Sequence, residues 1–351
     1  MDNAKIVSVF DGMACGMLAM MEAGVKVGRY VAYEIDKYAV QTSSHNFPEI
    51  EHRGDVFQAD FREFEGFDWL VGGSPCTYWS IVQKNNRETE ASGLGWELFC
   101  QYVRALKEVK PRFFIYENNK SMAEAIRQSI TETFGFDPIC INSALVSAQN
   151  RQRLYWVGKR NEDGNYSKVD VRQPEDRGIL LKDVLDSITA EPIKSLSEKE
   201  MQYMVGSTHG KYSDRWTYLQ KPGERDKAMC LTANISKGIP YNICAVATAW
   251  DEDGRPIKAV PGADGKEHPV YEVRDGFITI KGKKHAIKLA DGYYIIRKLT
   301  VSECKRLQTV PEWFEFPVSD TQAYKMLGNG WTVSVISHLI RACLEEADDE
   351  G

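Results

Sequence analysis

The stretch IVSVFDGMACGMLAMMEA, residues 6–23, decides the fold class of this chain. Its apolar start predicts a strand over residues 6–10, and its end predicts a helix over residues 16–23. The turn between them lies at the carboxyl edge of a sheet, where doubly wound proteins bind ligands. Backbone amides at such a helix start can hold a phosphate or carboxylate. A tight structural turn explains the stretch equally well, because its spacing is not the G-x-G-x-x-G of dinucleotide binders.

Short apolar runs and helical patterns continue to alternate up to residue 158. Apolar residues at every third or fourth position predict two more helices, residues 96–109 and 121–133. The further strand candidates are residues 30–33, 69–71, 113–116, 139–146 and 154–157. Alternation of this kind is typical of a parallel sheet covered on both faces. We therefore expect residues 1–158 to form a doubly wound α/β domain.

The rest of the chain follows a different pattern. Residues 159–295 have weak periodicity and contain the turn pairs Asp163-Gly164, Pro222-Gly223, Asp253-Gly254, Asp264-Gly265, Asp275-Gly276 and Asp291-Gly292. Such pairs predict short hairpins and loops, and hence a smaller, irregular domain. Helical patterns return at residues 300–308, where Ser302 is a candidate N-cap, and at residues 332–347. Residues 296–351 should therefore return to the first domain.

The composition excludes several classes of protein. Of 351 residues, 43% are apolar and 27% are charged, and no apolar run approaches the roughly 18 residues that span a bilayer. The first residues lack the sections of a signal peptide. We therefore expect a cytoplasmic monomer without a membrane segment. The eight cysteines include no CxxC pair, so neither a zinc site nor a disulfide framework is predicted.

The formal net charge of −6 argues mildly against a chain that coats nucleic acid, because phosphate binding needs concentrated positive charge. Local basic runs exist nevertheless, at Arg151, Arg153, Lys159 and Arg160 and at Lys281, Lys283, Lys284 and Lys288. A solvated face explains such runs about as well as contact with DNA does. Charge alone leaves the partner open.

Two acids follow predicted strands. Glu34 comes eighteen residues after Gly16, the place of an acid that accepts ribose hydroxyls, and Asp55 follows the third strand. Each acid taken alone is also explained as an ordinary surface residue. Together with the glycine turn, they favour a nucleoside-bearing cofactor.

The segment GGSPCTYWS, residues 72–80, places Cys76 in a loop just after a strand, whereas a structural cysteine is expected inside the strand. A thiolate in such a loop is a nucleophile. Glu117 stands at the exit of an apolar strand, where burial favours a role in proton transfer. Arg151 and Arg153 share one side of an extended segment, where they either face solvent or join the site. These four residues are the catalytic candidates.

The ordered set of these segments resembles the DNA cytosine-5 methyltransferases. The matching residues are Phe10-Asp11-Gly12 with Gly16, Glu34, Asp55, Pro75-Cys76, Glu117-Asn118, Gln149-x-Arg151-x-Arg153 and Gly328-Asn329. They span nearly the whole chain. The N-terminal half is especially similar to the vertebrate de novo branch, whereas Arg297-Lys298-Leu299-Thr300 and Leu327-Gly328-Asn329-Gly330 are closer to bacterial and phage enzymes.

The resemblance implies a Rossmann-like fold and a mechanism. Cys76 would attack C6 of a cytosine that is flipped out of a DNA duplex, and C5 would then take a methyl group from S-adenosylmethionine. Glu117 would bind N3 and the exocyclic amine. Arg151 and Arg153 would hold O2 and the loop around it, as fixed positive charge where charge develops. The location would be the cytoplasm of a bacterial cell or of a phage-infected host.

The resemblance also implies a cofactor site and no metal. Phe10 would pack on the adenine, the turn from Asp11 to Gly16 would meet the methionine end, and Glu34 and Asp55 would bind the ribose hydroxyls and the adenine amine. Trp331 would lie near the cofactor, although a core tryptophan is the alternative. The complete expected set is Phe10, Asp11, Gly12, Met13, Ala14, Cys15, Gly16, Glu34, Ile35, Asp55, Val56, Pro75, Asn329 and Trp331.

Residues 159–295 fall where the family carries its target-recognition domain, and residues 228–234, AMCLTAN, are similar to its short Leu-Thr segment. Two positions depart from the family. Asn119 stands where valine is usual, and Thr77 stands where glutamine or asparagine is common. Both bear on the fit of the flipped base.

Three alternatives compete with this interpretation. A cytosine-5 methyltransferase that acts on transfer RNA could share the same core. A non-catalytic DNA-binding regulator would be expected to lack Cys76 or Glu117. A nicotinamide-dependent oxidoreductase would leave Cys76, Glu117 and both arginines without a task.

Overall fold

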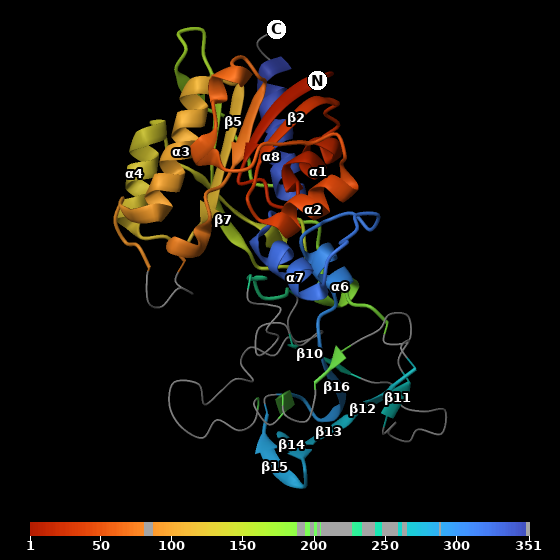
Figure 1. Cartoon of the computed structure of the whole chain (residues 1–351). Helices are drawn as coiled ribbons and strands as arrows, with labels where there is room; N and C mark the ends of the chain where they lie inside the picture. Colours follow the sequence, from red (N-terminus) through yellow and green to blue (C-terminus); the bar gives the residue numbers. More distant parts are fainter. Residues whose placement is uncertain are drawn as a thin grey trace.

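The computed structural model describes residues 1–80, 87–187, 194–196, 200–201, 204, 227–233, 243–247, 259–261, 265–287 and 289–348. These residues form two lobes (Figure 1). The large lobe contains an eight-stranded sheet with helices on both faces, and both labelled chain ends lie there. The small lobe contains a six-stranded sheet and the separate pair β11–β12. The predicted fold class, an α/β domain with a smaller second unit, is confirmed.

The strands of the large lobe run in the order β3-β2-β1-β4-β5-β7-β6, with β8 paired to β7. Neighbours from β3 to β5 are parallel, whereas β7 is antiparallel to β5, β6 and β8. The prediction of a parallel sheet is therefore wrong at this end, because the short link between β6 and β7 cannot make a crossover. The bounds are β1 (Ala4–Val9), β2 (Val27–Tyr33), β3 (Glu51–His52), β4 (Trp69–Gly72), β5 (Phe113–Asn119), β6 (Ile139–Asn142), β7 (Gln152–Arg160) and β8 (Tyr166–Lys168).

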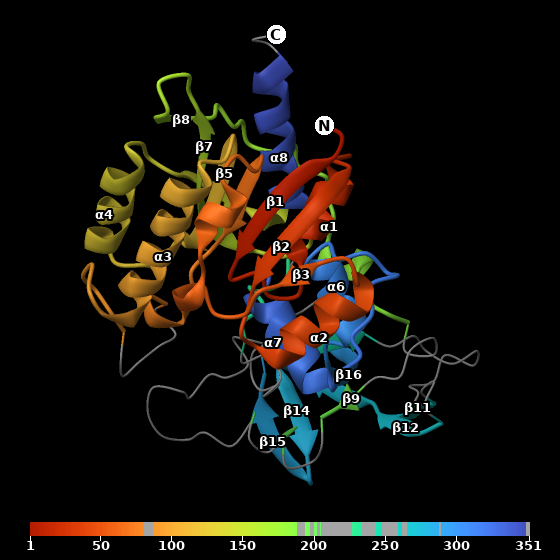
Figure 2. The ribbon, with the colours of Figure 1, turned by 45° about the horizontal axis from the view of Figure 1, so that its top comes forward.

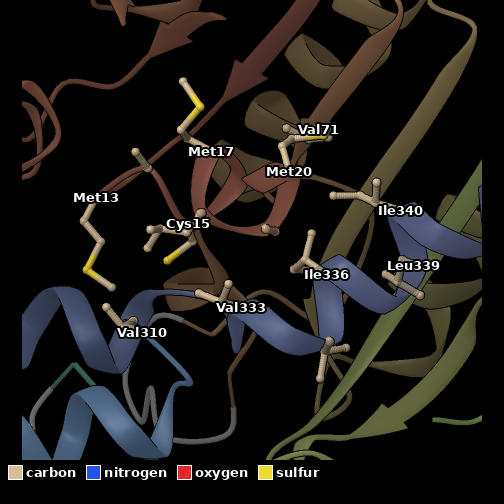
Figure 3. Close-up of a cluster of buried hydrophobic side chains, with 14 of the residues drawn as sticks. Met13, Cys15, Met17, Met20, Val71, Val310, Val333, Ile336, Leu339 and Ile340 are labelled. Atoms are coloured by element: carbon tan, nitrogen blue, oxygen red, sulfur yellow. The ribbon is translucent and has the colours of Figure 1, made fainter. Parts of the chain in front are cut away.

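Helices cover the two faces of this sheet (Figure 2). On one face α3 (Gly93–Val109) and α4 (Glu124–Phe134) bury an aromatic core. On the other face lie α1 (Cys15–Glu22) and α8 (Val333–Asp348). Figure 3 shows Met20 of α1 on the side toward Ile336 and Ile340 of α8, and all three belong to one core. Residues more than 300 positions apart thus share one core.

Several local predictions need correction. The strand predicted over residues 139–146 ends at Asn142, because the Asn142 side chain accepts a bond from the Ala144 amide and starts a 3-10 turn. The helix over residues 300–308 is α6 (Val301–Leu307), and its N-cap is Thr300, in a capping box with Glu303, rather than Ser302. The helices α2 (Lys37–Asn46) and α7 (Asp320–Asn329) were not predicted. In α2 the polar sequence KYAVQTSSHN hides the pattern.

The small lobe has the strand order β10-β16-β13-β14-β15, with β9 paired to β16. Its core consists of aliphatic and methionine side chains. The Asp275-Gly276 turn joins β13 to β14 with positive φ at both residues, as the sequence predicted. The pairs at 222–223 and 253–254, residue 264 and Lys288 lie outside the described residues. The bounds are β9 (Lys194–Ser195), β10 (Ile243–Ala247), β11 (Ala259–Pro261), β12 (Glu267–Pro269), β13 (Tyr271–Arg274), β14 (Phe277–Ile280), β15 (Lys283–Ala286) and β16 (Gly292–Lys298).

The large lobe extends past the expected boundary at residue 158. Strand β8 pairs with β7, and Val169, Val171 and Leu181 pack into the core beside α1 and α8. At the other boundary, β16 continues to Lys298 within the small-lobe sheet. Within the described residues, no helix is long and apolar enough to cross a membrane.

A buried ion pair joins the two lobes. Arg297 of β16 donates to both carboxylate oxygens of Glu303 on α6, at 2.9 and 2.5 Å, and both side chains are at most 1% exposed. Glu303 also accepts from the Thr300 and Asp186 amides. Every carboxylate oxygen is therefore satisfied, which offsets the desolvation of the charges.

Replacement of Glu303 by glutamine should leave the Arg297 charge buried without its counterion. We expect the free energy of unfolding to fall by about 3 kcal/mol, the scale for removal of one partner of a buried pair. The matched control is Glu312→Gln, in an exposed pair with Arg306, where the loss should stay below about 1 kcal/mol. Urea denaturation measures both. Equal losses in the two variants would contradict the role of the buried pair.

Candidate active site

A pocket opens at the carboxyl edge of the large sheet, where β1, β2, β4 and β5 end. Its lining includes most of the residues that the sequence predicted there: Phe10, Asp11, Gly12, Met13, Cys15, Glu34, Pro75, Glu117, Arg151, Arg153, Asn329 and Trp331. The lining also contains residues that were not predicted: Asp36, Ala39, Gly73, Ser74, Thr77, Lys325, Met326 and Gly330. The segments that line the pocket therefore come from both ends of the chain.

The turn after β1 forms one wall of this pocket. Phe10, Gly12 and Ala14 all have φ between 60° and 68°, which wraps the backbone tightly around the pocket. Glu34 holds the turn, because its carboxylate accepts from the Gly12 amide at 2.8 Å. The other Glu34 oxygen accepts from the amides of Ile35 and Asp36, also at 2.8 Å. Glu34 thus joins the ends of β1 and β2.

Some predicted cofactor residues do not line the pocket. The Ala14 side chain is buried. Gly16 packs against Tyr30, because a Cβ on Gly16 would lie 2.5 Å from the Tyr30 hydroxyl. Asp55 uses its side chain to cap a 3-10 turn by accepting from the Phe57 amide. Ile35 and Val56 are also absent from the lining. Their contact with a cofactor stays a prediction.

The loop that carries Cys76 is fixed to the end of β5. The Asn118 amide group donates to the Ser74 carbonyl at 3.1 Å, and the Ser74 and Tyr116 hydroxyls bond at 2.7 Å. A Cβ on Gly73 would lie 2.6 Å from the Glu117 carbonyl oxygen, so only glycine permits this approach. Cys76 begins the 3-10 turn Cys76–Tyr78, and its side chain lies outside the described part of the structure.

Glu117 is held by two donors from distant segments. Arg153 Nε lies 3.1 Å from Oε1, and the Trp331 indole donates to Oε2 at 3.0 Å. The side chains of Glu117 and Arg153 are 13% and 14% exposed, so the pair lines the pocket and remains within reach of a ligand. The two donors fix the plane of the carboxylate. Glu117, Arg153 and Trp331, all predicted site residues, thus contact one another in this pocket, and their roles stay a prediction.

Arg151 makes different contacts from those predicted. Its guanidinium donates to the carbonyls of Leu231, Gly328 and Gly330 at 2.9, 3.2 and 2.8 Å, and the side chain is 3% exposed. These bonds connect the start of β7 to the end of α7 and to residues 227–233, which we term the strap. A guanidinium with these bonds holds the segments around the pocket, and the predicted contact of Arg151 with the base stays a prediction.

The strap is attached to the large lobe along its length. Lys227 donates to the carbonyls of Ala144 and Ile179 at 2.7 and 2.6 Å. The Gln149 side chain accepts from the Leu231 amide at 2.7 Å. A Cβ on Gly328 would lie 2.1 Å from the Thr232 carbonyl oxygen, so the strap and α7 meet backbone to backbone.

The strap brings a further thiol, Cys230, next to two arginines of the site, which sequence reasoning missed. Cys230 Sγ lies 3.5 Å from Arg151 Nη1 and 4.0 Å from Arg153 Nη2. Burial alone would raise the pKa of this thiol, but the two guanidinium groups hold the pKa below its usual range. By contrast, burial raises the pKa of Cys15 to about 12, as expected of a packed core thiol.

Cys230 should therefore react faster with iodoacetamide near neutral pH than the more exposed Cys100, whose pKa is raised by partial burial and by Glu97. The thiolate is the reactive species, so the lower pKa should outweigh the lower exposure. Peptide mapping by mass spectrometry, with labelling times at several pH values, measures each cysteine separately. Faster labelling of Cys100 would show that the arginines do not activate Cys230.

One wall of the pocket is acidic. One carboxylate oxygen of Asp11, Oδ2, is buried without a hydrogen-bond partner, and Glu34 and Asp36 add further acid to the same wall. Among the described residues, no group of three or more His, Cys, Asp or Glu side chains could hold a metal ion.

The chain is similar to known proteins along most of its length. The profile of the C-5 cytosine-specific DNA methylases matches residues 4–345. The orphan methyltransferase M.SPRI of Bacillus phage SPR is 25% identical over 97% of this chain and 97% of its own length. The type II methyltransferase M1.ScrFI of Lactococcus lactis subsp. cremoris is 28% identical, over 97% of this chain and 78% of its own. The S. pombe Dnmt2 structure shares the fold, with a TM-score of 0.62 and 16% identity over 98% of this chain and 99% of that one.

Enzymes of this kind use S-adenosylmethionine as their methyl donor. The profile match covers almost the entire chain, and many of the motif residues that carry the resemblance line one pocket. The chain therefore belongs to the C-5 cytosine-specific DNA methylase family and is a DNA cytosine-5 methyltransferase.

Proposed function

We propose that the pocket binds S-adenosylmethionine beside a cytosine flipped from a DNA duplex, and that Cys76 is the nucleophile. The close approach of Gly73 to Glu117 carries this proposal, because it fixes the start of the Cys76 loop against the carboxylate. A thiolate and a carboxyl group on adjacent strand ends can meet one pyrimidine ring from two sides. Flipping is required because C6 is inaccessible within a duplex.

The proposed chemistry must make C5 of cytosine nucleophilic, which requires addition of a nucleophile at C6. The Cys76 thiolate forms a bond to C6 while Glu117 binds N3, so that the electron pair displaced from the C5–C6 bond makes C5 nucleophilic. Bound S-adenosylmethionine supplies an electrophilic methyl group. C5 takes this methyl group and then loses its proton to a base, and the sulfur–C6 bond breaks to return the thiolate. The net reaction releases one proton.

The other residues have distinct tasks in this proposal. Arg153 orients Glu117 and places positive charge near the base. Trp331 orients the other carboxylate oxygen. Arg151 positions the strap and the turn before Trp331. The turn from Phe10 to Cys15, Glu34, Pro75 and Asn329 would hold the cofactor, with Ile35, Asp55 and Val56 as candidates for its rim.

Asn119 makes contacts that differ from the expected fit with the base. Its side chain donates to Asn118 Oδ1 at 3.1 Å and accepts from the Ser121 hydroxyl at 2.7 Å, and it is 4% exposed. It therefore shapes the turn after β5. Thr77 does line the pocket and is the better candidate for base fit.

The small lobe would read the target sequence in duplex DNA, because base readout requires side chains placed in a groove. We assign this target-recognition task to the region between about residue 186 and β16, since the preceding residues belong to the large lobe. Action on transfer RNA and a purely regulatory role are the alternatives that an activity assay must separate.

In DNA from cells that express the chain, bisulfite sequencing should show cytosines protected from conversion at one target sequence. Cys76→Ala should abolish protection while the purified variant still binds S-adenosylmethionine, because the thiolate does not hold the cofactor. Glu117→Gln should slow methyl transfer on the order of 100-fold, the scale of general acid catalysis. Cys100→Ala is the matched control and should remain active.

Methylation by Cys76→Ala at the wild-type rate would contradict the role of this nucleophile. Methylation of transfer RNA and not of DNA would reverse the choice of substrate. If the wild-type protein methylates neither DNA nor transfer RNA but still binds DNA, the result would favour a non-catalytic regulatory role.

A further inference from the structure

Arg87 joins the Cys76 loop to the turn that follows β5. Its Nε donates to the Trp79 carbonyl at 3.2 Å, and its Nη2 donates to the Ser121 carbonyl at 2.7 Å. Trp79 is fully buried and comes directly after the 3-10 turn that Cys76 begins. Ser121 follows the strand that carries Glu117. A single guanidinium thus connects the segment of the proposed nucleophile to the segment of the carboxylate.

This bridge is one part of a closed ring of hydrogen bonds. The Ser121 hydroxyl donates to Asn119 Oδ1 at 2.7 Å, and the Asn119 side chain donates to Asn118 Oδ1 at 3.1 Å. Asn118 in turn donates to the Ser74 carbonyl at 3.1 Å, on the other side of Cys76. The end of β5 and the turn after it therefore hold the Cys76 loop both before and after the cysteine.

Glu88 fixes the segment that carries Arg87. Its amide donates to the Tyr78 carbonyl at 2.8 Å. Its carboxylate accepts from the Trp79 indole at 2.9 Å and from the Gly95 amide, in the first turn of α3, at 3.0 Å. The backbone beside Arg87 is therefore attached to the same 3-10 turn that the guanidinium bridges.

We propose that Arg87 is a positioning residue, which fixes the Cys76 turn relative to the Glu117 carboxylate. This inference rests on the proposed function, since it concerns the nucleophile and the carboxylate of that reaction. Arg87 does not line the pocket, so it acts through the backbone segments that it joins. The ring also gives a task to Asn119, which stands where valine is usual in the family, because a valine side chain accepts no hydrogen bond from Ser121.

The step that should depend on Arg87 is the chemical one. Addition of a thiolate to C6 requires the nucleophile and the group that binds N3 to meet the same ring, and a misplacement of about 1 Å costs on the order of 100-fold in rate. The cofactor wall is formed by other segments, the turn after β1 and Glu34. Loss of the bridge should therefore slow the reaction and leave the binding of both substrates unchanged.

The experiment compares single-turnover methyl transfer with the two binding affinities, at the target sequence that bisulfite sequencing identifies. In Arg87→Ala the single-turnover rate should fall on the order of 10- to 100-fold. Affinity for duplex DNA, measured by fluorescence anisotropy, and for S-adenosylmethionine, measured by isothermal titration calorimetry, should match the wild type. Arg87→Lys keeps the charge but lacks the fork that spans two carbonyls, so it should restore only part of the rate.

The matched control is Arg341→Ala. Arg341 also donates to a backbone carbonyl, that of Glu22, but at the opposite end of α1 from the pocket. This variant should keep the wild-type single-turnover rate. Thermal unfolding of both variants shows whether the loss in Arg87→Ala exceeds what an equal loss of stability produces in the control.

A double-mutant cycle tests the ring and does not depend on one variant. Asn119→Ala opens the ring at a second point, so it should slow the reaction as Arg87→Ala does. Because one opening already releases the turn, the double variant should be little slower than the slower single variant. Losses that multiply would show that the two residues act independently and would overturn the shared ring.

A wild-type single-turnover rate in Arg87→Ala would overturn the proposal. Weaker DNA binding by this variant, with an unchanged rate at saturating DNA, would assign the guanidinium to a phosphate contact and would overturn it as well. Failure of the wild-type protein itself to methylate DNA or transfer RNA would instead contradict the proposed function.

Discussion

The guanidinium of Arg151 is the contact on which the rest of the active site depends. It binds carbonyls of Leu231, Gly328 and Gly330, which lie 80, 177 and 179 residues away along the chain. These bonds hold the strap and the end of α7 against β7. Trp331 follows directly after this turn and holds Glu117. A single buried side chain thus connects the middle and C-terminal parts of the chain to a carboxylate on β5.

Glycines provide the second constraint, because the segments meet backbone to backbone. Gly73 allows the Cys76 loop to reach Glu117, and Gly328 allows α7 to reach the strap. Neither position has space for a Cβ. The same edge of the sheet also tolerates an unfavourable group, the half-satisfied carboxylate of Asp11. Close packing holds the Asp11 carboxylate in place despite its unpaired oxygen. The pocket thereby keeps a negative charge that is suited to a cationic ligand.

Local sequence patterns predicted the elements that depend on local interactions. The strand–turn–helix at residues 6–23, the helices α3, α4 and α8, and the strand-end positions of Cys76, Glu34 and Glu117 follow from periodicity and from the topology of α/β sheets. The direction of β7 was missed because strand pairing is not a local property.

The site contacts that the sequence did not show have the same cause. Arg151 and Arg153 share a motif, but their partners lie in distant segments, so spacing could not show that only Arg153 reaches Glu117. Cys230 enters the site through the strap, and no pattern near it indicates this. Asp55 and Gly16 occupy family positions, yet one caps a turn and the other packs on Tyr30. The family resemblance predicts where the motif residues stand in the sequence, whereas their contacts depend on tertiary packing.

The covalent step of the reaction is the central claim, and 5-fluorocytosine tests it most directly. Fluorine at C5 cannot leave as a cation, so a reaction that begins with addition of Cys76 to C6 should halt as a bonded complex. Duplex DNA with 5-fluorocytosine in the target site, incubated with S-adenosylmethionine, should give an adduct that survives denaturing electrophoresis and maps to Cys76. Failure of the wild-type protein to form this adduct at a verified target, or its formation by Cys76→Ala, would contradict the account.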